Sequence, residues 1–166
     1  MTKKHVVRKV LLSLAVAAVF LLLAAGSSSK QEKTSQFEPG DVIGWGNIQL
    51  TVLGMERTQK HRLVELKQDH EFILVRVRFV NKQNRDLSFP DDPDQFFLDV
   101  GGKQYKPAAM ELDKENPYVY RFAADETASA VYVYMVPVGK TGLVFCFDTY
   151  DAEQKGYIRM EVPLDG

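Results

Sequence analysis

Residues Glu71 to Asn81 read EFILVRVRFVN. From position 73 onward every second residue is apolar and arginines stand between them: Ile73, Val75, Val77 and Phe79 alternate with Arg76 and Arg78. An alternation of period two, rich in β-branched and aromatic residues, is typical of a β-strand with one buried face. The stretch therefore predicts a strand whose apolar residues face a core and whose arginines face solvent.

The same alternation recurs along the chain. We predict inward faces at Ile48, Leu50 and Val52; at Phe96 and Leu98; at Val131, Val133 and Met135; at Leu143, Phe145 and Phe147; and at Ile158, Met160 and Val162. Turn residues separate these segments, and only residues 108–114 have a helical character, enough for one turn. Seven to nine short strands predict an all-β domain over residues 39–166, an antiparallel sandwich in preference to a barrel.

The first 26 residues have the order of an export signal. Four basic residues and no acidic one precede an apolar run, Val10–Ala25, that only Ser13 interrupts. Small residues follow, so Ala24 and Gly26 fit a signal-peptide cleavage site. An uncleaved membrane anchor is an equal alternative, since sixteen helical residues span about 24 Å of a core about 30 Å thick. No cysteine stands directly after the apolar run, which argues against a lipid anchor. Residues 27–38 are predicted to form a flexible polar linker.

The charge balance and the cysteine content exclude several classes. The chain has 21 basic and 22 acidic residues, and removing the four basic residues of the leader leaves 17 against 22. This mildly acidic body predicts no nucleic-acid partner. The one cysteine, Cys146, excludes an intrachain disulfide and a multi-thiolate zinc site. Cys146 alternates with Phe145 and Phe147, and we expect a half-buried, inert thiol rather than an exposed one.

The sequence predicts no catalytic residue and no cofactor. A Gly-x-Ser-x-Gly motif is absent, and His61 and His70 lie in charged segments typical of solvated surface histidines. Asp91, Asp92 and Asp94 form an acidic cluster that offers oxygen ligands for calcium. The glycine and glutamate of a calcium-binding loop are missing at the required spacing, so a solvated turn is favoured over a metal site.

A partner-binding surface is the sharpest functional prediction. If Val131, Val133 and Met135 face the core, Tyr132 and Tyr134 face outward, as Arg76 and Arg78 do on their own strand. Arginine and tyrosine are enriched at binding hot spots. Ordinary cross-strand packing on a wetted sheet face is the alternative interpretation.

Four groups of motifs resemble a known bacterial family. They are residues 48–53 (IQLTVL); residues 72–81; residues 96–99 (FFLD) with 102–105 (GKQY); and residues 124–127 (ADET) with 132–137 and 143–145. In this order they resemble the exported immunoglobulin-like domain known as domain of unknown function 4352, related in fold to a mycobacterial immunoprotective extracellular antigen. The resemblance covers residues 40–147 and implies an immunoglobulin-like fold, exported or membrane-tethered, without established catalytic residues. Ala124 replaces a frequent turn glycine, and residues 156–162 add a possible strand.

These observations predict an exported, non-enzymatic module of the bacterial envelope, secreted or anchored with its domain outside. We expect it to bind an envelope protein or a surface ligand, and to contact the membrane through the N-terminal segment if the leader is retained. Two alternatives stay open. One is a calcium- or metal-dependent binding protein or small enzyme that uses the acidic loops, and the other is a structural accessory subunit of an envelope complex.

Overall fold

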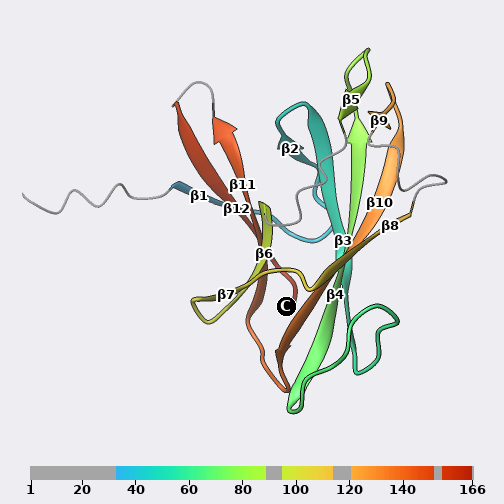
Figure 1. Ribbon diagram of the computed structural model, residues 1–166. Coiled ribbons are helices and arrows are strands. Elements are labelled where there is room, and N and C mark those ends of the chain that lie inside the picture. Colours follow the sequence, from blue (N-terminus) through green and yellow to red (C-terminus); the bar gives the residue numbers. More distant parts are fainter. Residues whose placement is uncertain (1–32, 89–94, 114–120, 152–154, 166) are drawn as a thin grey trace, which may run out of the picture. The chain divides into compact units, whose positions relative to one another are not determined.

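The computed structural model describes residues 33–88, 95–113, 121–151 and 155–165 (Figure 1). The predicted leader and the candidate calcium ligands Asp91, Asp92 and Asp94 lie outside the described residues. Within these ranges the regular structure consists of β-strands, and no helix there has the length and apolarity needed to cross a membrane. The strands are β1 (Lys33–Gln36), β2 (Ile43–Trp45), β3 (Ile48–Thr58), β4 (His70–Asn81), β5 (Leu87–Ser88), β6 (Phe96–Val100), β7 (Lys103–Tyr105), β8 (Ala109–Asp113), β9 (Arg121–Phe122), β10 (Thr127–Pro137), β11 (Leu143–Asp151) and β12 (Gly156–Pro163).

Ten of these strands form two five-stranded sheets. Sheet I has the order β1-β12-β11-β6-β7 and sheet II the order β2-β3-β4-β10-β8, while β5 and β9 pair separately. The predicted β-sandwich is confirmed, and so is the additional strand at residues 156–162, which is β12. The predicted number of seven to nine strands is too low, because the described residues form twelve. The pairing is antiparallel with one exception, because β1 runs parallel to β12.

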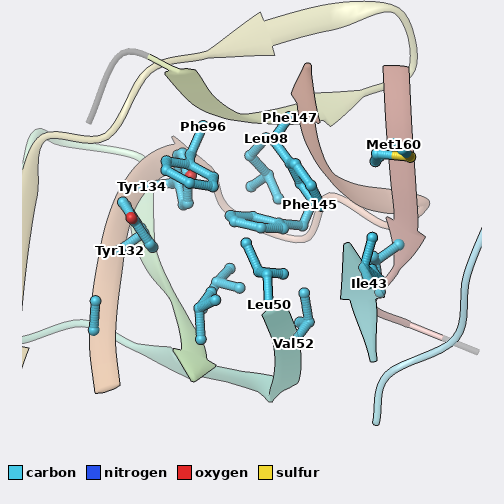
Figure 2. Close-up of a cluster of buried hydrophobic side chains, with 14 of the residues drawn as sticks. Ile43, Leu50, Val52, Phe96, Leu98, Tyr132, Tyr134, Phe145, Phe147 and Met160 are labelled. Atoms are coloured by element: carbon cyan, nitrogen blue, oxygen red, sulfur yellow. The ribbon is translucent and has the colours of Figure 1, made fainter. Parts of the chain in front are cut away.

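The inner faces of the two sheets meet in an apolar core (Figure 2). The opening stretch becomes β4, whose alternating residues 73, 75, 77 and 79 are fully buried while Arg76 and Arg78 are exposed. All the inward residues predicted on β3, β6, β11 and β12 are buried as well. Each such side chain contributes about 1.5–3 kcal/mol when it leaves water, so the alternating pattern specifies most of the stabilising surface.

The predicted faces of β10 are reversed, although Val133 is buried as expected. Tyr132 and Tyr134 are 0 % exposed and belong to the core, together with Ala128, Ala130 and Val136. The cause is the register with β4, in which Tyr132 pairs with Val75 and Tyr134 with Ile73. Side chains directly opposite each other across an antiparallel pair point to the same side. The buried face of β4 therefore takes the tyrosines inward, and Val131 points outward beside Arg76.

Part of the predicted flexible linker, residues 27–38, is a β-strand, and residues 27–32 lie outside the described residues. Lys33–Gln36 form β1, which pairs with residues 158–161 of β12. Phe37 then packs against the core, and its N–H donates to the Glu161 carbonyl oxygen at 2.9 Å. A polar sequence forms this strand because it lies at a sheet edge, where its side chains need no apolar surroundings.

Residues 109–113 form strand β8 and not the predicted helical turn. They pair with residues 129–133 of β10 at the edge of sheet II. Met110 and Leu112 are partly buried against the core and alternate with Glu111 and Asp113. The alternation of period two was present in the sequence AMELD, and sheet pairing outweighs the helix propensity of Ala, Met, Glu and Leu.

The side chain of Asn81, the last residue of β4, forms hydrogen bonds to the backbone of two loops. Its Nδ2 lies 3.0, 3.0 and 2.9 Å from the carbonyl oxygens of Arg85, Phe122 and Ala123, which share its two N–H groups, and its Oδ1 accepts from the Gln83 N–H at 2.9 Å. The side chain is fully buried. Asn81 thus holds two loops that are distant in sequence.

The turn before β10 needs no glycine at Ala124. The residue with a positive φ, 58°, is Asp125, and aspartate tolerates the left-handed region better than most residues. The adjacent Glu126 accepts the Ala123 N–H through Oε2 at 2.6 Å. The departure from a turn glycine therefore leaves the turn intact.

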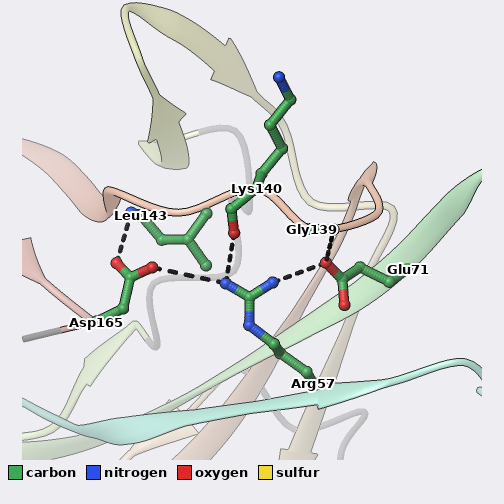
Figure 3. Close-up of polar contacts among 6 residues, drawn as sticks. All are labelled: Arg57, Glu71, Gly139, Lys140, Leu143 and Asp165. Carbon is green, nitrogen blue, oxygen red and sulfur yellow. Dashed lines mark hydrogen bonds and ion pairs between the residues drawn. The ribbon is translucent and has the colours of Figure 1, made fainter.

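A polar network closes one end of the sandwich (Figure 3). Arg57 Nη1 lies 2.7 Å from Glu71 Oε1, which also accepts the Gly139 N–H at 3.0 Å. Arg57 Nη2 donates to the Lys140 carbonyl oxygen at 2.6 Å and lies 3.6 Å from Asp165 Oδ2. The network ties β3 and β4 to the β10–β11 turn and to the chain that follows β12.

Candidate functional site

A bulge in β3 shapes the outer face of sheet II. The β3–β4 register shifts between Val52 and Gly54, because Leu53 is an extra residue without a partner on β4. Gly54 has a φ of 135°, which a residue with a side chain adopts only under strain. A bulge reverses the faces of the residues that follow. It leaves the Leu53 side chain 43 % exposed on the outside and turns Arg57 inward to the network of Figure 3.

Beside this bulge lies a groove with a volume of about 550 Å³, which we call the Arg76 groove. Its sheet side consists of Leu53, Leu74, Arg76 and Val131, and its walls come from residues 60–62 and from Glu111. The volume is within the range of about 300–1,000 Å³ that is typical of small-ligand sites. The groove combines an apolar surface with charged groups at its border.

Three polar side chains, two of them charged, meet at the wall of the Arg76 groove. Arg62 Nε donates to Glu111 Oε1 at 3.0 Å, and His61 Nε2 lies 3.3 Å from the same oxygen. The hydrogen bond from Arg62 is the main cause of a lowered pKa of the Glu111 carboxyl and of a raised pKa of the Arg62 guanidinium. This cluster pins the β3–β4 loop against β8.

His61 is not the solvated surface histidine that the sequence predicts. Its side chain is 8 % exposed, and its ring lies 5.8 Å from the Phe72 ring. His70 is partly exposed, and its Nδ1 lies 2.7 Å from the Gln68 carbonyl oxygen. His61 is buried because the loop folds back onto the sheet, an arrangement that its charged local sequence does not reveal.

The four residues predicted to bind a partner are divided between two faces. Arg76 and Arg78 are exposed on the outer face, and neither guanidinium makes a hydrogen bond or ion pair with any residue that the structure describes. Arg76 lines the groove and Arg78 does not. Tyr132 and Tyr134 are buried on the opposite face, where burial raises the pKa of both phenols. The tyrosines therefore cannot touch a partner of the folded domain.

The groove residues that the sequence reasoning missed come from the β3–β4 loop and from β8. Neither His61, Arg62 nor Glu111 stands in a motif, and 49 positions separate Arg62 from Glu111. The alternation of AMELD was a usable signal, since a strand there would have placed Glu111 on one face with Asp113. No local signal places the loop over that face.

The described residues contain neither a cluster suited to bind a metal ion nor an accessible thiol. Within them no three His, Cys, Asp or Glu residues gather closely enough to hold a metal ion. Cys146 is 1 % exposed, and burial is the main cause that raises its thiol pKa to about 12. Cys146 is thus more completely buried than the predicted half-buried position, and its inertness stays a prediction.

Together the fold and the groove define a β-sandwich domain with a partly charged groove on one outer sheet face. The family described as Domain of unknown function (DUF4352) matches residues 37–156, so the chain belongs to this family. The resemblance stated from the sequence motifs is thereby confirmed. A comparison with curated proteins finds no match.

Solved structures show the same fold. An uncharacterized β-sandwich protein from Clostridium difficile 630 has a TM-score of 0.56 and 16 % identity, covering 81 % of this chain and 98 % of that one. The yjhA protein from Bacillus subtilis has a TM-score of 0.53 and 13 % identity, with 75 % and 98 % covered. A protein named "putative lipoprotein (ycdA)", also from Bacillus subtilis, has a TM-score of 0.51 and 14 % identity, with 77 % and 39 % covered.

Proposed function

We propose that this protein is an exported, non-enzymatic immunoglobulin-like module of the bacterial envelope that binds a partner protein through the Arg76 groove. One observation carries the binding role. Arg76 presents a guanidinium that has no counterpart among the described residues, beside the exposed apolar side chain of Leu53.

The charges of the groove favour an acidic and partly apolar segment of the partner. Lys60, Arg62 and Arg76 provide three cations against the two carboxylates of Glu56 and Glu111. Arg62 is already engaged by Glu111 at 3.0 Å, so Arg76 and Lys60 are the cations left to a ligand. Arginine in a semi-enclosed apolar setting is the kind of residue that dominates binding energy.

Export is supported by the leader and by one structural neighbour. The order of basic, apolar and small residues in positions 1–29 is that of a signal or anchor. One protein of the same fold carries the name of a lipoprotein, which is a surface-attached class. If the leader of this chain is not cleaved, the apolar run itself anchors the protein in the membrane, because no cysteine stands directly after the run to carry a lipid.

A non-enzymatic role agrees with the positions and the burial of Cys146 and His61, the two candidate reactive residues. The Cys146 thiol, with a pKa of about 12, is not a thiolate at neutral pH. His61 lies in the β3–β4 loop, enclosed by Phe72 and Glu111, whereas Cys146 belongs to β11 of sheet I. Neither group is placed to act as a nucleophile or as its base.

Two experiments test this proposal: one measures on which side of the membrane the domain lies, and the other captures a binding partner. Protease added to intact spheroplasts should degrade the domain of the full chain, and protection of the domain would contradict export. After cross-linking in membranes, the wild type and the Arg85→Ala control should retain one partner that the Arg76→Ala/Arg78→Ala variant loses. Truncating a hot-spot arginine costs about 2 kcal/mol or more, roughly a thirtyfold loss of affinity.

Binding measurements with the purified partner then test whether the Arg76 groove is the binding surface. The affinity of the partner for the full chain should fall as salt increases, since exposed charge pairs are screened. Equal affinity of the double arginine variant and the wild type, at equal melting temperature, would reject the Arg76 groove as the binding surface.

A further inference from the structure

A second groove lies away from the Arg76 groove and is built around two exposed aromatic rings. Tyr150 on β11 and Tyr157 on β12 are direct cross-strand partners. Their ring centroids are 5.5 Å apart at an interplanar angle of 72°. The side chains are 55 % and 69 % exposed, and they are the only exposed aromatic residues in the part of the chain that the structure describes.

The tyrosines border a groove of about 370 Å³, the Tyr150 groove, whose wall includes Trp45. The indole is held in place, because its Nε1–H donates to the Asp148 carbonyl oxygen at 3.1 Å and its ring packs against Phe96 at 5.1 Å. Three aromatic side chains therefore form a preorganised surface at low entropic cost, since two of them pack on each other and the third is fixed.

The polar part of the Tyr150 groove is almost uncharged. Asn47, Gln95 and Thr149 contribute amide and hydroxyl groups, and among the described residues that line the groove none is Lys, Arg or His. The one carboxylate, that of Asp148, lies 3.4 Å from Arg159 Nε. An anionic ligand would find no cation here, whereas hydroxyl-rich neutral ligands would find donors and acceptors.

We infer that the Tyr150 groove binds a neutral β-linked oligosaccharide. In β-1,4-linked glucose-type chains the ring substituents are equatorial, so both faces of each pyranose ring present C–H groups. These faces stack on aromatic rings, and the ring hydroxyls pair with side-chain amides such as Asn47 and Gln95. A protein partner would also use aromatic residues, but a groove whose described lining combines aromatic rings, two side-chain amides and no cation matches a neutral sugar better.

The Arg76 groove lies on the outer face of sheet II, so sugar binding by the Tyr150 groove does not depend on it. The experiment titrates cellotetraose into the full chain, kept in a detergent without a sugar head group, and follows tryptophan fluorescence. The chain contains one tryptophan, so the signal reports Trp45 directly. We expect saturable binding that Tyr150→Ala and Tyr157→Ala each weaken about tenfold, the equivalent of about 1.4 kcal/mol for one lost aromatic contact.

Matched variants make the outcome decisive. Tyr150→Phe keeps the stacking face and should bind within about twofold of the wild type. Tyr105→Ala, at a tyrosine outside the groove, and Arg76→Ala/Arg78→Ala should bind like the wild type, which separates this site from the partner groove. The variants at Tyr150, Tyr157 and the two arginines should keep the melting temperature, because these residues are exposed. Tyr105→Ala should lower it, because Tyr105 packs against the core.

Three results would overturn the inference. The first is no fluorescence change with the wild type at about 10 mM cellotetraose, a concentration that reveals even weak sites. The second is equal binding by both tyrosine-to-alanine variants. The third is a stronger response to a sulfated tetrasaccharide than to cellotetraose, which would contradict the neutral ligand class.

Discussion

Tyr132 of β10 lies directly opposite Val75 of β4, and both side chains are fully buried between the sheets. The Tyr132 ring is 4.7 Å from the Phe96 ring of sheet I, so it bridges the two layers of the sandwich (Figure 2). Its hydroxyl has no hydrogen-bond partner among the described residues. The ring thus stabilises the core while the hydroxyl does not.

We predict opposite effects for two substitutions of Tyr132. Tyr132→Phe removes an unpaired buried hydroxyl and should leave the free energy of unfolding unchanged or raise it by about 1 kcal/mol. Tyr132→Ala should lower it by about 3–5 kcal/mol through the cavity that it opens. Urea unfolding of both variants checks the pair. A clear loss in Tyr132→Phe would mean that a buried water satisfies the hydroxyl.

Stability should fall at alkaline pH. Burial raises the pKa of the Cys146 thiol from 9.0 to about 12 and raises the pKa of the Tyr132 and Tyr134 phenols above 10.0. A raised folded-state pKa gives stability that is fully present below the unfolded pKa and is lost as pH rises toward the folded pKa. The free energy of unfolding should therefore decline from about pH 9 upward.

The control for that decline is the Tyr132→Phe/Tyr134→Phe variant, which removes both phenols. Its stability should depend less on pH between about 10 and 12 than that of the wild type. Identical slopes measured by urea denaturation across this interval would contradict the role assigned to the phenols.

The Cys146 thiol should be unreactive in the folded protein. Its side chain is 1 % exposed and its pKa is about 12, so both access and thiolate formation are suppressed. Ellman's reagent at pH 8 should label the native chain far more slowly than the chain in concentrated urea. Rapid labelling of the native chain would show that β11 opens locally.

Asn81→Ala should destabilise the domain strongly. The substitution leaves three carbonyl oxygens and one N–H without the partner that Asn81 provides. A hydrogen bond contributes about 0.5–1.5 kcal/mol and the buried Asn81 side chain makes several, so we expect a loss of roughly 3 kcal/mol in urea unfolding. Asn84→Ala, at an exposed position of the same turn, is the control and should change stability by less than about 0.5 kcal/mol.

Arg57→Met should weaken the closed end of the sandwich. Methionine keeps the aliphatic stem and removes the hydrogen bonds to Glu71 and Lys140 (Figure 3). A charge-assisted hydrogen bond contributes about 1.5–3 kcal/mol, and the loss should lie in that range because Arg57 is partly exposed. Arg85→Met is the matched control, and hydrogen exchange at residues 139–143 should accelerate only in Arg57→Met.

The candidate sites show where sequence reasoning reaches its limit. Arg76 and Arg78 could be placed on the outer face from the alternation of β4 alone. The neighbours that turn Arg76 into part of a groove come from a loop and an edge strand, and no local pattern joins His61 and Arg62 to Glu111. Tyr150 and Tyr157 likewise become a pair only through the β11–β12 register.

The sequence by itself determined the all-β class, the core residues of β3, β4, β6, β11 and β12, and the family, because alternation and turn residues are local properties. Only the tertiary structure decided which face of β10 is buried. Both of its faces are apolar enough for a core, so a period of two cannot choose between them. Pairing with β4, whose EFILVRVRFVN stretch has one charged face, makes the choice and sends Tyr132 inward. The same non-local pairing brings the polar residues 33–36 into sheet I.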